Sequence, residues 1–502
     1  MTTESAATTG EPIRPQGRGW SRWADSPRLT LAALTVLALV LRLLFLGKSF
    51  WEAEGESIAI VHGNQAAGSW AAFGHVLWAR EFNMALYYVL LRFWLHLGNS
   101  EFFIRLFSVI PGVAAIALVY TLGERLCGRK VALTAALLLT IHGAHVAYSQ
   151  EARSYALLVF LCTASYLFFV LAVETSALKY WLLYVFLSAL AVYTHFFAYL
   201  IFPAQLLALL WLPRAQVPWK RLIASMAAIA LLTAPAAVFV LTRNVGQLSE
   251  IHSTWGRVPN LISEFAGTGA AVPVYLVLWG YAVFSWVRSG AISSRSQPAW
   301  RRALLMNWLA LPAVLTLFAC LTKPILETRY LLFCLSASVL VAAWGLFEIS
   351  VRWRFSVAVI TVILSLAGVG YIYAKPKDNW RDVSNYVLSH AQSGDVVTVV
   401  PAASRWTFDY YRNRRPVPGL AYSFPESEGA AAWAASIPIH SSVWVIFHNK
   451  GNLPSAGAAN RAHDELTAAL QSRFHLQERI PFNMGAVELY EETPTRQATD
   501  GP

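Results

Sequence analysis

The chain has 502 residues, of which 56% are hydrophobic and only 13% are charged. A chain this long and this apolar cannot close around a single water-soluble core, so lipid must be part of its solvent. The formal net charge of +11 does not indicate a nucleic-acid partner, because the Arg and Lys residues occur in small clusters between apolar runs, as in the cytoplasmic loops of membrane proteins. The sequence therefore predicts an all-α polytopic membrane protein.

Residues 1–28 are polar and are predicted to be a disordered, cytoplasmic N-terminus. Apolar runs of about 20 residues, enough to cross a hydrocarbon core, then recur about eleven times up to residue 374. The predicted spans are 29–47, 102–124, 131–148, 154–174, 180–194, 196–213, 221–242, 270–287, 302–322, 329–349 and 355–374. With a break near Thr194, basic residues gather in alternate loops, which places the N-terminus in the cytoplasm and the C-terminal domain outside the cell membrane.

Two outer segments are longer than connections require. The first, residues 48–100, contains the amphipathic run Ala85–Leu95, which is too short to span and is expected to lie along the membrane interface. The second, residues 243–269, is predicted either to cover a cavity or to be a plain surface loop.

The composition changes after residue 374, and residues 375–502 are predicted to form a small extracytoplasmic α/β domain. Strand and helix patterns alternate along it. The expected helices are 379–390 and 462–472, and the expected strands are 395–400, 442–447, 475–480 and 485–491.

Three carboxylates, Glu52, Glu54 and Glu56, lie at the start of the first outer segment. On a helix Glu52 and Glu56 share a face, whereas Glu54 points away from them. Acids packed this closely suit a general base or a cation site. The alternative is a solvated helix start at which the helix dipole favours acids.

Charged and aromatic residues recur at other outer positions. The stretch Tyr148–Tyr155 brings Glu151 and Arg153 to the lip of the predicted cavity, where the arginine either pairs with the glutamate or receives an anionic headgroup. Lys323 and Arg329 place further cations at the same face. His195, beside aromatic residues, is either a hydrogen-bonded packing residue or a ligand.

The order of these features resembles that of the GT-C membrane glycosyltransferases, in particular the bacterial relatives of the protein O-mannosyltransferases and of the lipid A aminoarabinose transferase (glycosyltransferase families 39 and 83). The resemblance covers residues 29–374, the expected catalytic domain. The stretches that carry it are Trp51–Ser57, Glu81 with Asn83–Tyr88, Ser100–Phe102 with Arg105–Ser108, Tyr148–Tyr155, and Arg329–Tyr330.

The resemblance implies that a sugar, mannose-like or a pentose, is transferred with inversion from a polyprenyl-monophosphate donor. The acceptor hydroxyl would belong to a protein, a lipid or a cell-wall glycan at the outer face. A carboxylate would take the acceptor proton, and fixed cations would hold the departing lipid phosphate. The candidate residues are Glu54, Glu52 and Glu81 for catalysis, Arg153, Arg329 and Lys323 for the donor phosphate, and Glu151, Tyr88 and His195 for substrate binding.

Two stretches depart from the family pattern. Asn83–Ala85 stands where members commonly carry a basic residue and Pro-Pro, which argues against a phosphate contact there, and Ala53 stands where members usually carry an aspartate. Either Glu54 or Glu52 then replaces that acid, or the chain is a catalytically silent membrane scaffold. Glu81 is either the family's second outer acid, which could aid a divalent metal ion, or a surface partner of Arg80. The metal requirement is left open.

A lipid or polysaccharide transporter, or a flippase, is the competing interpretation. Such proteins typically carry ionisable residues near mid-span and interrupted helices in both halves. The central spans contain His142 and His145 but almost no acids, and this favours the glycosyltransferase.

Overall fold

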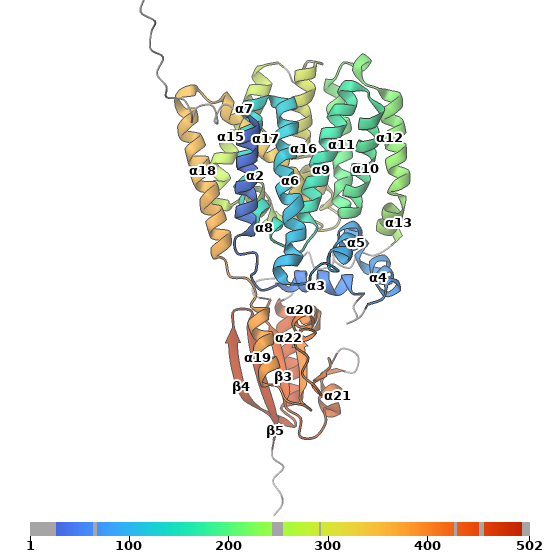
Figure 1. Ribbon diagram of the computed structural model, residues 1–502, viewed down its shortest axis with the longest axis vertical. Helices are drawn as coiled ribbons and strands as arrows, with labels where there is room; N and C mark the ends of the chain where they lie inside the picture. The colour runs from blue at the N-terminus through green and yellow to red at the C-terminus, as the bar shows by residue number, and fades with distance from the viewer. Residues whose placement is uncertain are drawn as a thin grey trace, which may run out of the picture.

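The computed structural model describes residues 27–63, 68–242, 255–290, 293–425, 429–450 and 456–493. Helices form a bundle, and a small domain with a β-sheet adjoins one end of it (Figure 1). The predicted fold class is confirmed. Of the N-terminus predicted to be disordered, residues 1–26 lie outside the described part of the chain.

Each of the predicted spans corresponds to a helix or to consecutive helices. These are α2 (Pro27–Leu43), α6 (Glu101–Cys127), α7 (Arg129–Thr140) with α8 (Gly143–Ser149), α9 (Tyr155–Thr175), α10 (Leu178–Thr194), η3 (Phe196–Leu200) with α11 (Ile201–Ala208) and η4 (Leu209–Trp211), α12 (Trp219–Leu232) with α13 (Ala234–Thr242), η8 (Gly269–Ala271) with α15 (Val272–Arg288), α16 (Gln297–Ala319), η10 (Thr328–Cys334) with α17 (Leu335–Glu348), and α18 (Val351–Ala374). A short turn, η5 (Arg214–Gln216), connects η4 to α12.

Length and hydropathy single out 6 of these helical segments as able to cross a membrane, or up to 8 if each bent pair, α7 with α8 and α12 with α13, is one span. These counts apply to the described ranges. The helices α2 and α10 have 17 residues each, and the segment Phe196–Trp211 is also apolar. His195 is extended between α10 and η3, which confirms the break expected near Thr194.

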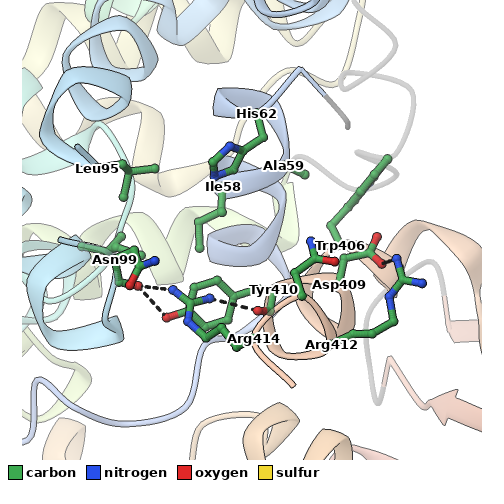
Figure 2. Close-up of a pocket in the computed structure, with 12 residues that line it drawn as sticks. Ile58, Ala59, His62, Leu95, Asn99, Trp406, Asp409, Tyr410, Arg412 and Arg414 are labelled. Atoms are coloured by element: carbon green, nitrogen blue, oxygen red, sulfur yellow. Dashed lines mark hydrogen bonds and ion pairs between the residues drawn. The ribbon is translucent and has the colours of Figure 1, made fainter. Parts of the chain in front are cut away.

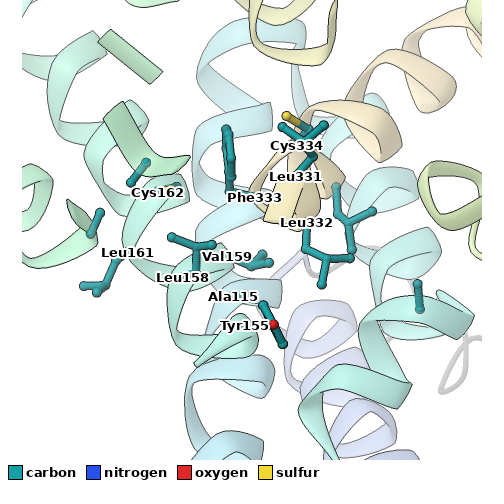
Figure 3. Close-up of a cluster of buried hydrophobic side chains, with 14 of the residues drawn as sticks. Ala115, Tyr155, Leu158, Val159, Leu161, Cys162, Leu331, Leu332, Phe333 and Cys334 are labelled. Carbon is teal, nitrogen blue, oxygen red and sulfur yellow. The ribbon is translucent and has the colours of Figure 1, made fainter. Parts of the chain in front are cut away.

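The centre of the bundle is formed by α9 and by η10 with α17. Leu158 and Cys162 of α9 belong to the same buried cluster as Leu331 and Phe333 of η10 (Figure 3). Glycine allows closer approach elsewhere: a Cβ added to Gly345 of α17 would lie 1.8 Å from a backbone carbonyl oxygen of α15. Such close backbone contact is typical of helix packing in lipid.

A buried arginine stabilises the 57° bend between α7 and α8. The guanidinium of Arg42 donates hydrogen bonds to the carbonyl oxygens of Leu139 and Thr140 at the end of α7 and contacts His145 Nδ1 at 2.6 Å. These bonds satisfy carbonyl groups that the interrupted helix leaves free, as backbone buried in lipid requires. The bend is therefore stabilised by specific side-chain contacts.

The outer segments form short helices at the end of the bundle that faces the sheet domain (Figure 1). The first segment contains α3 (Glu52–Val61), α4 (Trp70–Val76), the π-helical turn η1 (Leu77–Glu81), η2 (Phe82–Met84) and α5 (Ala85–Trp94). The amphipathic run expected at 85–95 is thus helix α5. The second segment contains η7 (Trp255–Arg257) and α14 (Val258–Ala266), and its residues 243–254 lie outside the described ranges.

The C-terminal domain is a mixed five-stranded sheet with helices. Its elements are α19 (Trp380–His390), β1 (Val396–Val400), η11 (Ala402–Ser404), α20 (Arg405–Arg412), β2 (Ala421–Tyr422), α21 (Gly429–Ser436), β3 (Val443–His448), α22 (Ala456–Leu470), β4 (Phe474–Phe482) and β5 (Gly485–Glu492). The strand order is β2-β1-β3-β5-β4; β1 is parallel to β2 and β3, and β5 is antiparallel to β3 and β4.

The predicted helices and strands of this domain are confirmed, and α20, α21 and β2 were missed. The missed elements have only 8, 8 and 2 residues, too few for a periodic pattern to stand out. Every residue of β1 and β3 is buried, as expected of central strands covered on both faces.

The domain is attached to α3 mainly through α20. Glu52 accepts a hydrogen bond from Ser404 at 2.8 Å and forms an ion pair with Lys450. A Cβ added to Gly55 would lie 2.2 Å from Thr407 Oγ1 and 2.5 Å from Thr407 Cα. The glycine therefore allows α20 to lie directly on α3.

Candidate functional site

The carboxylate of Glu54 is fully buried and bound on both oxygens. Arg105 of α6 donates from Nε to Oε1 at 2.7 Å and from Nη2 to Oε2 at 2.6 Å, and the amide of Ala152 donates to Oε1 at 2.9 Å. Burial alone would raise the pKa of Glu54, but the charge and hydrogen bonds of Arg105 lower it below its ordinary value. In this geometry Glu54 is a fixed negative charge that holds α3 against α6.

The other two acids of α3 have different partners. Glu52 faces the C-terminal domain through Ser404 and Lys450, whereas Glu56 Oε2 lies 3.6 Å from Arg153 Nη1. The expected acidic patch is therefore divided among three cations from three parts of the fold. Its carboxylates do not converge on one point as ligands of a divalent cation would.

Arg153 is buried between α3 and α5. Its Nη1 donates to the carbonyl oxygen of Ala53 at 3.2 Å, to Ser57 Oγ at 3.3 Å and to the Tyr88 hydroxyl at 3.5 Å. Its Nε has no hydrogen-bond partner among the described residues. Arg153 therefore keeps a donor for an anion while its position is fixed.

The second predicted cation, Arg329 of η10, lies near the same centre. Its Nε is 3.7 Å from Glu327 and also lacks a hydrogen-bond partner within the described ranges. Burial raises the pKa of Glu151, and Lys377, Arg329 and Arg153 all act against that rise. The structure therefore brings both arginines to the carboxylate of Glu151, beside Glu54.

The remaining predicted residues differ in how close they lie to the centre formed by Glu151, Arg153 and Arg329. Burial raises the pKa of Tyr88, the positive charge of Arg153 lowers it, and the negative charge of Glu81 raises it. Glu81 therefore lies near Tyr88 and Arg153. His195 accepts the amide of Phe197 at its Nδ1 and lies 3.3 Å from Asn83 at its Nε2, as a packing residue would. Lys323 is exposed, and no hydrogen bond or ion pair of its side chain to the centre occurs in the described structure.

A cavity of about 960 Å³, here called the α8–α18 cavity, opens beside Glu151. Small and apolar residues of two helices form one wall: Ala144 and Ala147 of α8, and Ala367, Gly368 and Ile372 of α18. Lysines lie at its other end, after the first and last predicted spans: Lys48, Lys375 and Lys377. The described part of the predicted segment 243–269 also lines the cavity, and so covers it, through Asn260, Ser263, Glu264, Gly267, Thr268 and Gly269.

The lysines of the α8–α18 cavity are mutually repulsive. Burial lowers the pKa of Lys48, and the nearby charges of Lys377 and Arg105 lower it further. Lys377 Nζ lies 3.9 Å from Glu54 Oε2. Positive charge thus accumulates at this end of the cavity, and an anion bound there would relieve the repulsion. These lysines were missed in the sequence; the available signal was basic residues in outer loops, where the positive-inside rule expects few.

Glu264 of α14 also lines this cavity. Its Oε1 accepts hydrogen bonds from the Tyr148 hydroxyl at 3.0 Å and from Thr328 Oγ1 at 2.9 Å. Its Oε2 has no hydrogen-bond partner among the described residues, and neither has Oε2 of Glu151. Burial raises the pKa of Glu264 to about 7 despite its two hydrogen bonds. Glu264 was not predicted as a site residue, because its only distinction in the sequence was its place in the 243–269 segment.

A second pocket, of about 350 Å³, lies between α3 and α20. Figure 2 shows Arg412 beside Asp409 and Arg414 against Tyr410. The Asp409–Arg412 distance is 3.1 Å, and Arg414 donates to the carbonyl oxygen of Tyr410 at 2.9 Å. Because these charged groups already bind protein atoms, the α8–α18 cavity is the stronger candidate site.

No group of three or more His, Cys, Asp or Glu side chains that could hold a metal ion occurs in the part of the chain that the structure describes. Three of the acids that the sequence offered for a cation site, Glu54, Glu52 and Glu56, are bound by Arg105, Lys450 and Arg153 instead, and Glu81 joins no such group within the described ranges. The residues present therefore do not fit a divalent metal site in this arrangement.

The comparisons with a protein-family model and with solved structures indicate the same fold. Residues 84–240 match the model of the dolichyl-phosphate-mannose-protein mannosyltransferase family. No curated protein matches the chain in sequence.

Among solved structures, ArnT from Cupriavidus metallidurans bound to undecaprenyl phosphate has a TM-score of 0.60 at 12% identity, covering 94% of this chain and 98% of that one. The oligosaccharyltransferase AglB from Archaeoglobus fulgidus, in complex with an inhibitory peptide and a dolichol-phosphate, has a TM-score of 0.56 at 12% identity, covering 96% and 75%. The mycobacterial arabinofuranosyltransferase AftD has a TM-score of 0.52 at 15% identity, covering 93% and 41%. At these identities the likeness shows a shared fold.

Proposed function

We propose that this chain, which has the fold of the GT-C membrane glycosyltransferases, transfers a sugar from a polyprenyl-monophosphate donor to an acceptor hydroxyl at the extracytoplasmic face. The α8–α18 cavity carries the proposal, because one wall is apolar and the other end is cationic. Two proteins of similar fold are bound to undecaprenyl phosphate and to a dolichol-phosphate. A site for a lipid phosphate is therefore compatible with this fold.

The cavity suits both parts of such a donor. Only 22% of the apolar window of α18 is buried, so a polyprenyl chain could lie along the exposed face of this helix. The phosphate would meet Lys48 and Lys377, which line the cavity. The departing phosphate gains negative charge in the transition state, and fixed cations in a water-poor site stabilise that charge.

The match to the mannosyltransferase model supports a mannose-like sugar over a pentose. Direct attack by the acceptor hydroxyl on the sugar carbon would invert its configuration. The acceptor would be a hydroxyl of a protein, a lipid or a cell-wall glycan. The positive-inside distribution supports a cytoplasmic N-terminus and an extracytoplasmic C-terminal domain.

The test is reconstitution of the purified chain in liposomes with radiolabelled undecaprenyl-phosphate mannose or undecaprenyl-phosphate arabinose and a membrane and cell-wall extract as acceptor. We expect label to pass to the acceptor. The double variant Lys48→Ala with Lys377→Ala should raise the donor KM at least tenfold, while Lys179→Ala, in a predicted cytoplasmic loop, should not. Absence of transfer from either donor, together with protein-dependent movement of the labelled lipid across the bilayer, would instead support a flippase.

A further inference from the structure

Transfer to a hydroxyl needs a group that takes the hydroxyl proton. The acids of α3 are poorly placed for this in the structure, because Glu54 is bound on both oxygens by Arg105 and Ala152, and Glu52 is bound by Lys450 and Ser404. Glu56 pairs with Arg153 and does not line the α8–α18 cavity. Ala53 between them has no ionisable group. The proton acceptor is therefore sought among the acids that line the α8–α18 cavity, Glu151 and Glu264.

We propose that Glu264 is the general base, with its Oε2 receiving the proton of the acceptor hydroxyl; this rests on the proposed function. Tyr148 and Thr328 fix Oε1 at 3.0 and 2.9 Å, which orients the carboxyl group. Oε2 is buried and has no hydrogen-bond partner among the described residues. A buried acceptor oxygen without a partner is costly unless a ligand supplies the donor.

The position of Glu264 also fits the donor. Thr328, which binds its Oε1, directly precedes Arg329, so the base and a phosphate-binding cation are held by the same turn, η10. Lys377 lines the same α8–α18 cavity from the linker after α18. The acceptor hydroxyl could therefore lie between Glu264 and the sugar carbon attached to the phosphate.

The chemical step balances without a further reactant. The acceptor oxygen forms a bond to the sugar carbon as its proton moves to Glu264 Oε2. The bond between that carbon and the phosphate oxygen breaks, and its electron pair leaves with the polyprenyl phosphate. The proton later passes from Glu264 to water, which restores the carboxylate.

The surroundings of Glu264 set the pH at which it can act. The groups that face it are Tyr148 of α8 and Glu327 and Arg329 at η10, and Glu151 lies across the cavity. Burial is the main reason that its pKa is about 7. A general base works best when its pKa is near the operating pH. Glu151 is less suitable, because its carboxylate lies among the cations Arg153, Arg329 and Lys377.

The deciding variant is Glu264→Gln, which keeps the oxygen that accepts from Tyr148 and Thr328 but cannot take a proton. We expect kcat to fall at least 100-fold, within the range of about 10²–10⁴ that general bases contribute, with stabilisation by added undecaprenyl phosphate in a thermal-shift assay unchanged. The wild-type kcat/KM should fall about tenfold per pH unit below pH 7. Glu264→Asp should retain partial activity with a displaced acid limb.

The matched control is Glu124→Gln, which alters a glutamate that also accepts from a tyrosine, Tyr120 at 2.8 Å, at the other end of the bundle; its activity should equal that of the wild type. Wild-type transfer that persists in Glu264→Gln would overturn the base assignment while leaving the proposed function intact. No transfer by the wild type from either donor would reject the proposed function and this inference with it.

Discussion

The buried pair Glu54–Arg105 allows the structural and catalytic roles of Glu54 to be separated. Glu54→Gln keeps the shape of the side chain but leaves the guanidinium of Arg105, whose side chain is 1% exposed, without its counter-charge. Removing one partner of a buried ion pair costs about 3–5 kcal/mol. Arg105 retains hydrogen bonds to the carbonyl oxygens of Leu46, Lys48 and Ser49, so we expect the lower end of this range. At an unfolding entropy of about 2.1 cal/mol/K per residue, a chain of 502 residues loses about 1 °C in Tm per kcal/mol, so we expect a fall in Tm of about 3 °C.

Thermal unfolding of the purified chain in detergent, followed by tryptophan fluorescence, measures this change. Glu56→Gln is the control, because its pair with Arg153 is longer, at 3.6 Å, and the glutamate side chain is 40% exposed, so it should change stability by less than about 1 kcal/mol. Replacing both members of the buried pair, with Arg105→Met added to Glu54→Gln, should recover part of the lost stability. An unchanged Tm for Glu54→Gln with transfer abolished would refute the structural role and point to Glu54 as the base.

Two further results are expected. Gly55→Ala should separate α20 from α3, because the new Cβ would lie 2.2 Å from Thr407 Oγ1. Limited trypsin digestion should then cut the C-terminal domain faster. The control Gly74→Ala, with nothing within 4 Å of its Cβ, should leave the digestion rate unchanged. The pKa of Glu264 is raised from 4.5 to about 7, so its contribution to stability is present below pH 4.5 and is lost as the pH rises through 7, by about 3 kcal/mol. Glu264→Gln should accordingly raise the Tm relative to wild type at pH 8 but not at pH 5, and an equal difference at both pH values would contradict the buried, protonatable carboxyl.

The spans could be predicted because lipid imposes a long apolar run on every crossing helix. The strands of the C-terminal domain could be predicted from the buried runs of β1 and β3. The break near Thr194 was set by the charge of the loops on either side, and the structure places it at His195. These features are local, so each leaves its own pattern in the sequence.

The site was only partly predictable because it depends on contacts between distant segments. Glu151 and Arg153 were found because both occur at the end of an apolar run. The partner of Glu54, however, is Arg105, 51 residues away in sequence, and no local pattern indicates that these two residues pair. Lys48 and Lys377 meet only because the ends of the first and last membrane helices lie side by side, which Lys48 shows by donating a hydrogen bond to the carbonyl oxygen of Tyr373.

Helix α3 is held by contacts on two sides. Arg105 binds it from the helix bundle, and Lys450, Ser404 and Thr407 bind it from the C-terminal domain. The C-terminal domain is thus integral to the fold, since cutting the chain after α18 would remove the contacts of Lys450, Ser404 and Thr407 with the helix that carries Glu54. An exchange of this domain between homologues would have to transplant the matching residues of α3, Glu52 and Gly55, together with α20. A substitution on the surface of α3 or of α20 should therefore be tolerated only when the facing surface still fits it.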